Sequence, residues 1–309
     1  MTKGPAKKIE DITKGFAKNN YICSKQISSA VYLANELEKP ILVEGPPGVG
    51  KTELANTAAL YYKKALVRLQ CYEGLDETKA LYEWRYGKQL LYTQILKEQM
   101  QDVLKGAKGL KESLDRLMKF EDIFFSEDFL ESRPLLQALT SNEGSVLLID
   151  EVDKSDEEFE ALLLEILSEF QVSIPELGGK KAKIKPLVIL TSNNSREIGD
   201  ALKRRCLHLY IPFPDAKLER EIIRARVPEI SKNLQVQLVN FVQGLRELDL
   251  KKLPAISETI DWAKTLILLN ADELNEDLAK ETLNVLLKHQ QDIEVVQREV
   301  PRLVMAANG

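Results

Sequence analysis

The sequence is poor in the residues that build metal centres and disulfide frameworks. It has three cysteines and two histidines in 309 residues. Cys23, Cys71 and Cys206 lie far apart and form no CxxC pair. We therefore expect no structural zinc site and no disulfide framework, but buried thiols in a reducing compartment. His208 and His289 are isolated, and neither is a candidate for chemistry.

Long apolar runs and a basic surplus are also missing. No window comes close to the roughly 18 uncharged apolar residues that a membrane span needs. The N-terminus, MTKGPAKKIEDITKG, is polar and lacks the apolar run of a signal peptide. The formal net charge is -5, which argues mildly against nucleic acid as the main partner. Together these absences indicate a cytoplasmic protein.

The residues that are present describe a soluble chain whose pattern changes once. The composition is 44% hydrophobic and 29% charged, which suits one large domain or a large and a small one. Up to residue 212, apolar runs alternate with helical patterns, which predicts an α/β domain with a mostly parallel sheet. Only helical patterns follow. We expect a loose, polar lead-in at 1–20, the α/β domain at 21–212 and a smaller all-α domain at 213–309.

Five apolar runs are candidates for buried strands of the sheet. They cover residues 41–44, 65–70, 145–150, 186–193 and 206–213. Helical spacing predicts helices at 27–37, 52–63, 93–120 and 156–170, and beyond the sheet at 218–226, 231–248, 257–269 and 277–288. Residues 171–185 resemble two short strands around a Gly-Gly turn.

A glycine-rich loop, VEGPPGVGKTEL at residues 43–54, matches a phosphate-binding pattern. Gly45, Gly50, Lys51 and Thr52 satisfy G-x-x-x-x-G-K-[ST], between an apolar strand and a helix, as this pattern requires. The glycines let backbone N–H groups surround an anion, and the helix N-terminus adds positive potential. Lys51 would reach the phosphates and Thr52 would hold Mg²⁺. An ordinary tight turn is the disfavoured alternative. The candidate nucleotide-binding residues here are Gly45, Pro46, Pro47, Gly48, Val49, Gly50, Lys51, Thr52 and Glu53.

Two acidic residues end the apolar run LLIDEVD. Ligands of open α/β sheets bind beyond the carboxyl ends of the strands, so Asp150 and Glu151 should face the phosphate loop. Asp150 can orient the water shell of Mg²⁺, and Glu151 can act as the general base that polarises the attacking water. Acidic loop residues of no function are the alternative, and the neighbouring phosphate loop disfavours it.

The spacing between these two motifs predicts an insertion. Two βαβ units need roughly 60 residues, and Lys51 and Asp150 are much further apart than that. We place the surplus at about residues 72–143. It contains an aromatic cluster, YEWRYG at 82–87, that either grips a polypeptide or packs a short hairpin.

Polar residues flank two further apolar runs, one at its end and one at its start. Asn193 ends VILTSN, where an amide can hold the attacking water or sense the γ-phosphate; a turn-forming asparagine is the alternative. Arg204 and Arg205 precede the last apolar run. A guanidinium can stabilise transition-state charge on a phosphate, and one that points away from its own loop must serve a neighbouring subunit. A solvated basic turn is the alternative.

The order of these features resembles the AAA+ ATPases. Phosphate loop, acidic strand end, asparagine, arginines and a helical lid follow one another from about Tyr21 to Val304, nearly the whole chain. Within that superfamily, ALLLEILSEFQVSIPELG, a hairpin and LVILTSNN resemble the MoxR family. The segments NYICSKQISSAVYLANELEKPILVEGPPGVGKTEL and LQCYEGLDETKALYEWRYGKQLLY are similar to its branch implicated in maturing carbon monoxide dehydrogenase.

The resemblance implies a P-loop αβα sandwich with a five-stranded, mostly parallel sheet and a smaller all-α lid. Nucleotide would lie between them and between subunits. Lys51 and Thr52 become Walker A residues, Asp150 and Glu151 Walker B residues, and Asn193 sensor 1. Arg205 takes the place of the arginine finger, with Arg204 as the alternative, and Ile22 looks like a wall of the adenine pocket. The insertions at 72–143 and 171–185 are similar to the family's helix-2 and pre-sensor insertions, which tend to face the ring pore.

One departure concerns sensor 2, an arginine that many relatives carry at the start of a lid helix. The comparable stretch here reads PAISETIDWAK, with Ser257 near the expected place. Either sensor 2 is absent, or Lys251 or Lys252 substitutes for it. Coupling of the lid to nucleotide is therefore open.

Three functions compete. The first is a MoxR-type ATPase and chaperone, a ring expected to be hexameric, which uses ATP and Mg²⁺ to mature a client protein, with a metalloenzyme client and a von Willebrand factor A-domain co-worker implied by resemblance. The second is a nucleic-acid motor or clamp loader, which would need a basic DNA-reading domain. The third, a small-molecule P-loop kinase, does not explain Asn193, the arginines or the lid.

Overall fold

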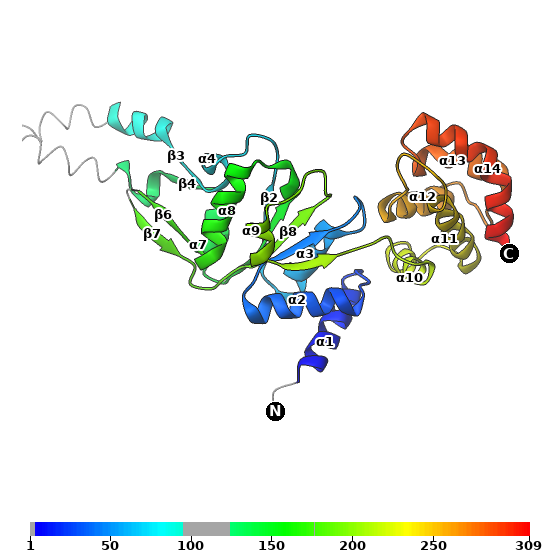
Figure 1. Cartoon of the computed structure of the whole chain (residues 1–309), viewed down its shortest axis with the longest axis horizontal. Coiled ribbons are helices and arrows are strands. Elements are labelled where there is room, and N and C mark those ends of the chain that lie inside the picture. Colours follow the sequence, from blue (N-terminus) through cyan, green and yellow to red (C-terminus); the bar gives the residue numbers. More distant parts are fainter. Residues whose placement is uncertain (1–3, 95–123, 176) are drawn as a thin grey trace, which may run out of the picture.

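The structure, a computed structural model, describes residues 4–94, 124–175 and 177–309 of the chain. Its centre is a five-stranded parallel sheet in the order β2-β5-β8-β1-β9 (Figure 1). The strands are β1 (Ile41–Glu44), β2 (Ala65–Gln70), β5 (Ser145–Asp150), β8 (Leu187–Ser192) and β9 (Leu207–Tyr210). The five-stranded parallel sheet predicted from the sequence is thereby confirmed.

The strand sequences explain their places in the sheet. β5 and β8 are buried along their whole length, because a central strand of a parallel sheet is covered on both faces. β2 lies at an edge, and there the apolar run tolerates Arg68 and Gln70. Both of these polar residues lie near the carboxyl end of β2, beside the end of β5.

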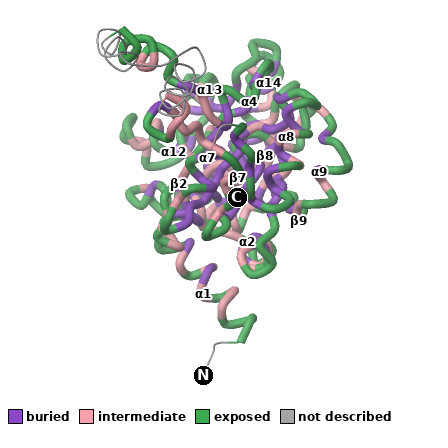
Figure 2. Tube along the Cα trace, turned by 90° about the vertical axis from the view of Figure 1, so that its left-hand side faces the viewer, coloured by how far each residue is buried: buried purple, intermediate pink, exposed green. Residues whose placement is uncertain are grey.

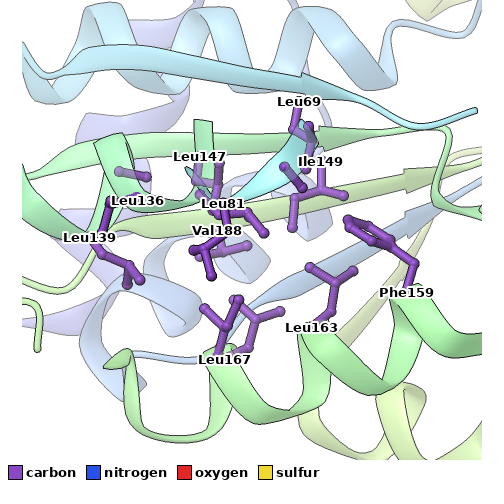
Figure 3. Packing of buried hydrophobic residues seen from close by; sticks show 14 of the residues in the cluster. Leu69, Leu81, Leu136, Leu139, Leu147, Ile149, Phe159, Leu163, Leu167 and Val188 are labelled. Carbon is purple, nitrogen blue, oxygen red and sulfur yellow. The ribbon is translucent and has the colours of Figure 1, made fainter. Parts of the chain in front are cut away.

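Helices cover both faces of the sheet. Leu147 and Ile149 of β5 pack with α7 (Pro134–Thr140) and α8 (Glu157–Glu169), as Figure 3 shows. The alternate residues Val146 and Leu148 pack in a second core with α2 (Lys25–Leu37) and α3 (Lys51–Tyr62). Successive side chains of a strand point to opposite faces, so one strand serves two cores. Figure 2 shows the buried residues concentrated along the strands.

The N-terminal segment is ordered, contrary to the loose lead-in expected at residues 1–20. Residues Pro5–Lys18 form α1, which contacts α2 and α3. Ile12 and Phe16 are buried, and the Phe16 ring lies 5.7 Å from the Tyr61 ring, edge to face. The segment is mostly polar, but its few large apolar residues fall on one stripe of a helix. Composition alone concealed that stripe.

The insertion at 72–143 contributes a small layer of its own. It contains α4 (Glu77–Ala80), β3 (Tyr82–Trp84), the 3₁₀ turn η1 (Glu127–Phe129), β4 (Leu130–Ser132) and α7. β3 and β4 pair antiparallel, and the Trp84 ring meets the Phe125 ring at 5.3 Å. Trp84 therefore packs this hairpin, whereas Tyr86 is 64% exposed. Most of the helix expected at 93–120 lies outside the described residues.

A second hairpin follows α8. β6 (Gln171–Ile174) pairs antiparallel with β7 (Gly178–Lys181). The Gly-Gly pair was expected to form the turn, but Gly178 and Gly179 open β7 instead. Gly178 has φ +76°, a left-handed value that lets the chain leave the turn and enter the strand.

Beyond the sheet the chain forms five helices, which we call the lid helices. They are α10 (Ala216–Arg226), α11 (Lys232–Arg246), α12 (Ile256–Leu268), α13 (Glu276–Leu286) and α14 (Gln290–Asn308). Four were predicted. α14 was missed, although Val296, Val300 and Leu303 make a buried stripe that packs into the core of the lid helices. Pro301 lies inside it. None of the described helices is apolar over a length that could cross a membrane.

Candidate active site

The phosphate loop lies where β1 ends and α3 begins. Lys51 is the first residue of α3, and Gly50 before it has φ +94°. Gly45 has φ +151°, and a Cβ there would come 2.2 Å from the carbonyl oxygen of Ile211. Only glycine fits this close approach of two backbones. The loop is thus built against the residue that follows β9.

Lys51 is buried within this loop. Its Nζ donates to the carbonyl oxygens of Gly45 and Pro46, both at 2.7 Å, and to Oδ1 of Asn193 at 2.8 Å. Burial lowers the pKa of Lys51, and the nearby Asp153, Asp150 and Glu151 oppose that shift. The ammonium is thus held between the loop and the end of β8, where a phosphate of the nucleotide would be met.

Asp150 ends β5 beside Thr52. The Thr52 hydroxyl donates to Asp150 Oδ1 at 3.1 Å, the Thr191 hydroxyl donates to the same oxygen at 2.6 Å, and Arg68 Nη2 donates to Oδ2 at 2.6 Å. Mg²⁺ is bound in proteins by one or two such oxygen groups together with substrate phosphates and water. Thr52 and Asp150 therefore suit Mg²⁺.

Glu151 is held in place by three neighbours. Its Oε1 accepts from Asn193 Nδ2 at 3.2 Å, and its Oε2 accepts from Gln70 Nε2 at 3.0 Å and from Lys154 Nζ at 2.6 Å. Its backbone has φ +56°, a left-handed conformation that is uncommon for a side chain of this kind. The chain turns sharply here, which keeps the Glu151 carboxylate at the strand ends.

Asn193 joins the two halves of the site. Its side-chain oxygen accepts from Lys51 and its side-chain nitrogen donates to Glu151. Asp153, which is buried, fixes this residue from behind by accepting from the backbone N–H groups of Asn193 and Ser195. Burial raises the pKa of Asp153, but hydrogen bonds from the Ser195 hydroxyl and from those N–H groups outweigh it, so that its pKa is lowered.

A cavity of about 400 Å³ opens beside the phosphate loop. Ile22, the predicted adenine wall, lines it together with apolar side chains from the sheet domain and from the lid helices. These apolar residues are Ile27, Ile211, Pro212, Pro214, Leu218, Ile222, Ile256 and Ile260. Its size and its mixture of an apolar wall with a few polar groups are typical of a small-molecule site.

The lid helices reach the phosphate loop directly. Ser257 lines the cavity, and a Cβ on Gly48 would come 2.6 Å from its Oγ. Lys251 and Lys252, the suggested substitutes for sensor 2, are not among the cavity-lining residues. Arg226, at the end of α10, does line the cavity and pairs with Glu53 Oε1 at 3.2 Å.

Comparison with known proteins agrees with this geometry. The family profile of the AAA domain, dynein-related subfamily, matches residues 40–206, more than half of the chain. The chain belongs to this AAA domain family. The match runs from just before β1 to just after α9 and so includes the phosphate loop, Asp150, Glu151 and Asn193.

Individual relatives are distant. The gas vesicle ATPase GvpN of Haloferax mediterranei is 27% identical over 224 residues, covering 69% of this chain and 58% of GvpN. GvpN1 of Halobacterium salinarum is 27% identical over 228 residues, covering 69% and 57%. An uncharacterised protein of Staphylococcus haemolyticus is 24% identical, covering 81% and 84%. The chain thus matches less than two thirds of the length of the two gas vesicle ATPases.

Among solved structures, the Holliday junction branch migration motor RuvB of Thermotoga maritima is similar, with a TM-score of 0.45 and 19% identity. The match covers 84% of this chain and 67% of RuvB. A point mutant of the same motor gives a TM-score of 0.48 with 20% identity, covering 84% and 68%.

The two candidate finger residues of this AAA domain lie away from its own site. Arg204 and Arg205 are exposed at the end of α9 (Asp200–Arg205), and neither lines the cavity. Arg205 Nη1 donates to the carbonyl oxygen of Leu164 and to the Ser168 hydroxyl on α8. The structure therefore gathers the predicted loop, Asp150, Glu151, Asn193 and Ile22, and leaves the arginines outside.

Sequence reasoning missed several polar residues of this site, among them Arg68, Gln70 and Arg226. Arg68 and Gln70 lie two apart in β2, so they project on one face, and Gln70 pairs with Asp150 across the sheet. Two polar residues inside an apolar run, near its carboxyl end, were the available signal. Arg226 is one of several basic residues in α10, and nothing in its local pattern separates it from Arg224.

Proposed function

We propose that the chain is a ring-forming, Mg²⁺-dependent ATPase of the MoxR type that remodels a client protein. Membership of the AAA domain family supports nucleotide binding, and the bridge that Asn193 makes between Lys51 and Glu151 is the observation that carries hydrolysis. Asn193, which follows β8, thus lies between Lys51, the residue proposed to bind the phosphates, and Glu151, the residue proposed to activate water. Residues 21–212, with α1 packed against α2 and α3, would be one domain and residues 213–309 the other.

The chemistry follows from the positions of the side chains. Lys51 and the N–H groups of the phosphate loop bind the phosphates, and the apolar wall with Ile22 receives the base. Bound Mg²⁺ would be held through Thr52 and Asp150 and would neutralise developing charge on the phosphates. The Glu151 carboxylate accepts a proton from the attacking water, and Asn193 Nδ2 fixes the orientation of that carboxylate.

Replacing Glu151 with Gln tests the assignment of the general base. Glu151→Gln should bind ATP and hydrolyse it about 10² to 10⁴-fold more slowly, because general-base catalysis contributes on this scale. Turnover and the binding of a fluorescent ATP analogue should be measured together. Glu158→Gln is the matched control, because Glu158 is an exposed glutamate seven positions further on at the start of α8. Full turnover in Glu151→Gln would show that Glu151 is not the base.

A ring, expected to have six subunits, would bring Arg205 or Arg204 to the nucleotide of a neighbour. The exposure of both arginines away from their own cavity supports this. Mixing Arg205→Ala subunits with Lys51→Ala subunits should restore activity, because some mixed interfaces then carry both an intact loop and an intact finger. The same mixture with Arg204→Ala distinguishes the two arginines. Rings that show no recovery at any ratio would remove the role in trans.

The client is proposed from resemblance. A metalloenzyme that needs cofactor insertion, as in the carbon monoxide dehydrogenase branch, is the first candidate, with a von Willebrand factor A-domain protein as co-worker. A pull-down with Glu151→Gln held in ATP, with Lys51→Ala as the control, should enrich such proteins. Salt-sensitive stimulation of turnover by DNA would instead support a nucleic-acid motor.

A further inference from the structure

Asp150, the residue proposed to orient Mg²⁺, already has a cation beside it. Asp150 is 3% exposed, and Arg68 Nη2 lies 2.6 Å from its Oδ2. Arg68 comes from the neighbouring edge strand and was not part of any predicted motif. A buried carboxylate is costly without a counter-charge, so the guanidinium stabilises Asp150 in this conformation.

The contacts of Asp150 divide between its two oxygens. Thr52 and Thr191 make their shorter or only contacts with Oδ1, at 3.1 and 2.6 Å, whereas Arg68 takes Oδ2. Both Asp150 oxygens lie within 3.3 Å of the Thr52 hydroxyl, which is the other proposed ligand of Mg²⁺. A metal shared by Thr52 and Asp150 would therefore lie on the carboxylate that Arg68 now neutralises.

Arg68 is free to leave, in contrast to Lys51. Its side chain is 53% exposed, and besides Asp150 its Nη2 donates to Gln70 Oε1 at 2.8 Å on the same strand. When the Arg68 guanidinium leaves Asp150, hydration by solvent offsets much of the lost contact, because the group is already partly exposed and lies on a long flexible stem. The Arg68 guanidinium and Mg²⁺ would repel each other if both contacted the Asp150 carboxylate. Mg²⁺ carries two charges and would also be bound by the nucleotide phosphates, so it should bind the carboxylate more strongly than Arg68 does.

We propose that Arg68 is the counter-cation of Asp150 in the metal-free protein and that Mg²⁺ displaces it when the metal and nucleotide bind together. This rests on the proposed metal site at Thr52 and Asp150. Arg68 stabilises the fold while the site holds no metal, and it weakens the apparent affinity for Mg²⁺ because the metal must first compete with it.

Arg68→Gln tests both halves, with Arg85→Gln as the matched control. Arg85 also faces a carboxylate from a neighbouring strand, Glu131 at 3.6 Å, and its side chain is 48% exposed. In EDTA without nucleotide, Arg68→Gln should melt at a lower temperature than wild type and Arg85→Gln. Saturating Mg²⁺ and ADP should narrow that gap, since the metal then neutralises Asp150 in both proteins.

The second measurement is a Mg²⁺ titration at a fixed concentration of fluorescent ADP. The half-saturating Mg²⁺ concentration should fall about threefold to tenfold in Arg68→Gln, the scale of a half-exposed charge-assisted pair. Arg68→Lys keeps the charge on a shorter stem, so its midpoint should lie below that of wild type but above that of Arg68→Gln. An unchanged midpoint in Arg68→Gln would overturn the displacement, and a raised one would show that Arg68 assists binding instead.

The two levels of failure are distinguishable. If nucleotide binding by the wild type does not depend on Mg²⁺ at all, the proposed metal site is wrong and the displacement falls with it. If the wild type depends on Mg²⁺ and the Arg68→Gln titration overlays it, only the role of Arg68 is wrong. Should Arg68→Gln not fold, Arg68→Lys decides the same point, because its shorter stem weakens the contact and should lower the midpoint in the same direction.

Discussion

Two acid–arginine pairs in this molecule look alike and have different surroundings. In the lid, Arg246 donates through two nitrogens to both oxygens of Glu219, at 2.7 and 2.8 Å, and the two side chains are 7% and 0% exposed. In the site, Arg68 uses one nitrogen on Asp150 and is 53% exposed. The lid pair is therefore shielded from solvent, whereas the arginine of the pair in the site is exposed to solvent.

The neighbours reinforce this contrast. Glu219 also accepts from Thr259 and Gln243, and Arg246 lies 4.9 Å from the centre of the Phe213 ring. The charged groups of Glu219 and Arg246 thus find their partners within the lid helices and the segment before them. Neither Glu219 nor Arg246 lines the cavity beside the phosphate loop, so a cation bound there would not displace Arg246. Asp150 faces the phosphate loop, where a metal can take the place of the arginine. Burial and saturation thus distinguish a permanent ion pair from an exchangeable one.

Breaking the lid pair should have the largest effect on stability. Arg246→Met leaves Glu219 buried without its counter-charge, which costs about 3–5 kcal/mol of unfolding free energy. Urea unfolding should report this loss. Arg302→Met, in an exposed pair with Glu299 on α14, is the control and should cost less than about 1 kcal/mol. The double variant Arg246→Met, Glu219→Gln should recover part of the loss; a double variant as unstable as the single one would contradict the charge explanation.

Asp153 extends the comparison to a buried carboxylate that has hydrogen-bond donors and, among the residues that the structure describes, no arginine partner. Asp153→Asn should cost about 1–3 kcal/mol, because the N–H groups of Asn193 and Ser195 lose a charged acceptor. The lowered pKa of Asp153 sets the pH dependence. Its contribution is present above the ordinary aspartate pKa of about 3.9 and is lost as pH falls through the lower folded value.

This pH dependence can be measured by chemical unfolding of both proteins across acid pH. The stability difference between wild type and Asp153→Asn should be constant near neutral pH and should shrink below about pH 4. A difference that grows in acid would show that burial, which raises the pKa, dominates over the hydrogen bonds.

The pair between Arg226 and Glu53 should give the smallest effect. Both side chains are more than a third exposed, at 37% and 35%, so the pair is worth less than about 1 kcal/mol. Arg226→Gln should weaken nucleotide binding by up to about fivefold and should reduce its sensitivity to salt. Arg224→Gln, two residues earlier on α10, is the control. Equal effects of the two variants would remove any specific role of Arg226 at the cavity.

The sequence predicted the parts of this molecule that depend on local order. Apolar strand runs, the glycine spacing before Lys51 and the acidic end of β5 each carry their meaning within a few residues. Arg68, the cation beside Asp150, could not be recognised in this way, because its position there depends on which strand is the neighbour of β5. The order β2-β5-β8-β1-β9 arises from packing, and it alone makes Arg68 adjacent to Asp150.

The sequence analysis missed α1 and α14 for a related reason. Each is polar on average, and each becomes a helix of the core because a few residues, such as Phe16 or Val300, find apolar partners far away in sequence. Tertiary packing supplies most of the stability of such helices. A short stripe in a polar background therefore says little until the partner surface is known.

The contact between Gly45 and Ile211 has a mechanical consequence. The N–H of Ile211 donates to the carbonyl oxygen of Glu44 at 2.8 Å, so the chain is fastened to the sheet up to that residue. Asp215 caps α10 and belongs to the lid. Any rotation of the lid must therefore pivot within the residues between, Pro212 to Pro214. This pivot begins one residue beyond Ile211, whose carbonyl oxygen lies against Gly45, so the first glycine of the phosphate loop stays fixed to the sheet while the lid turns next to it.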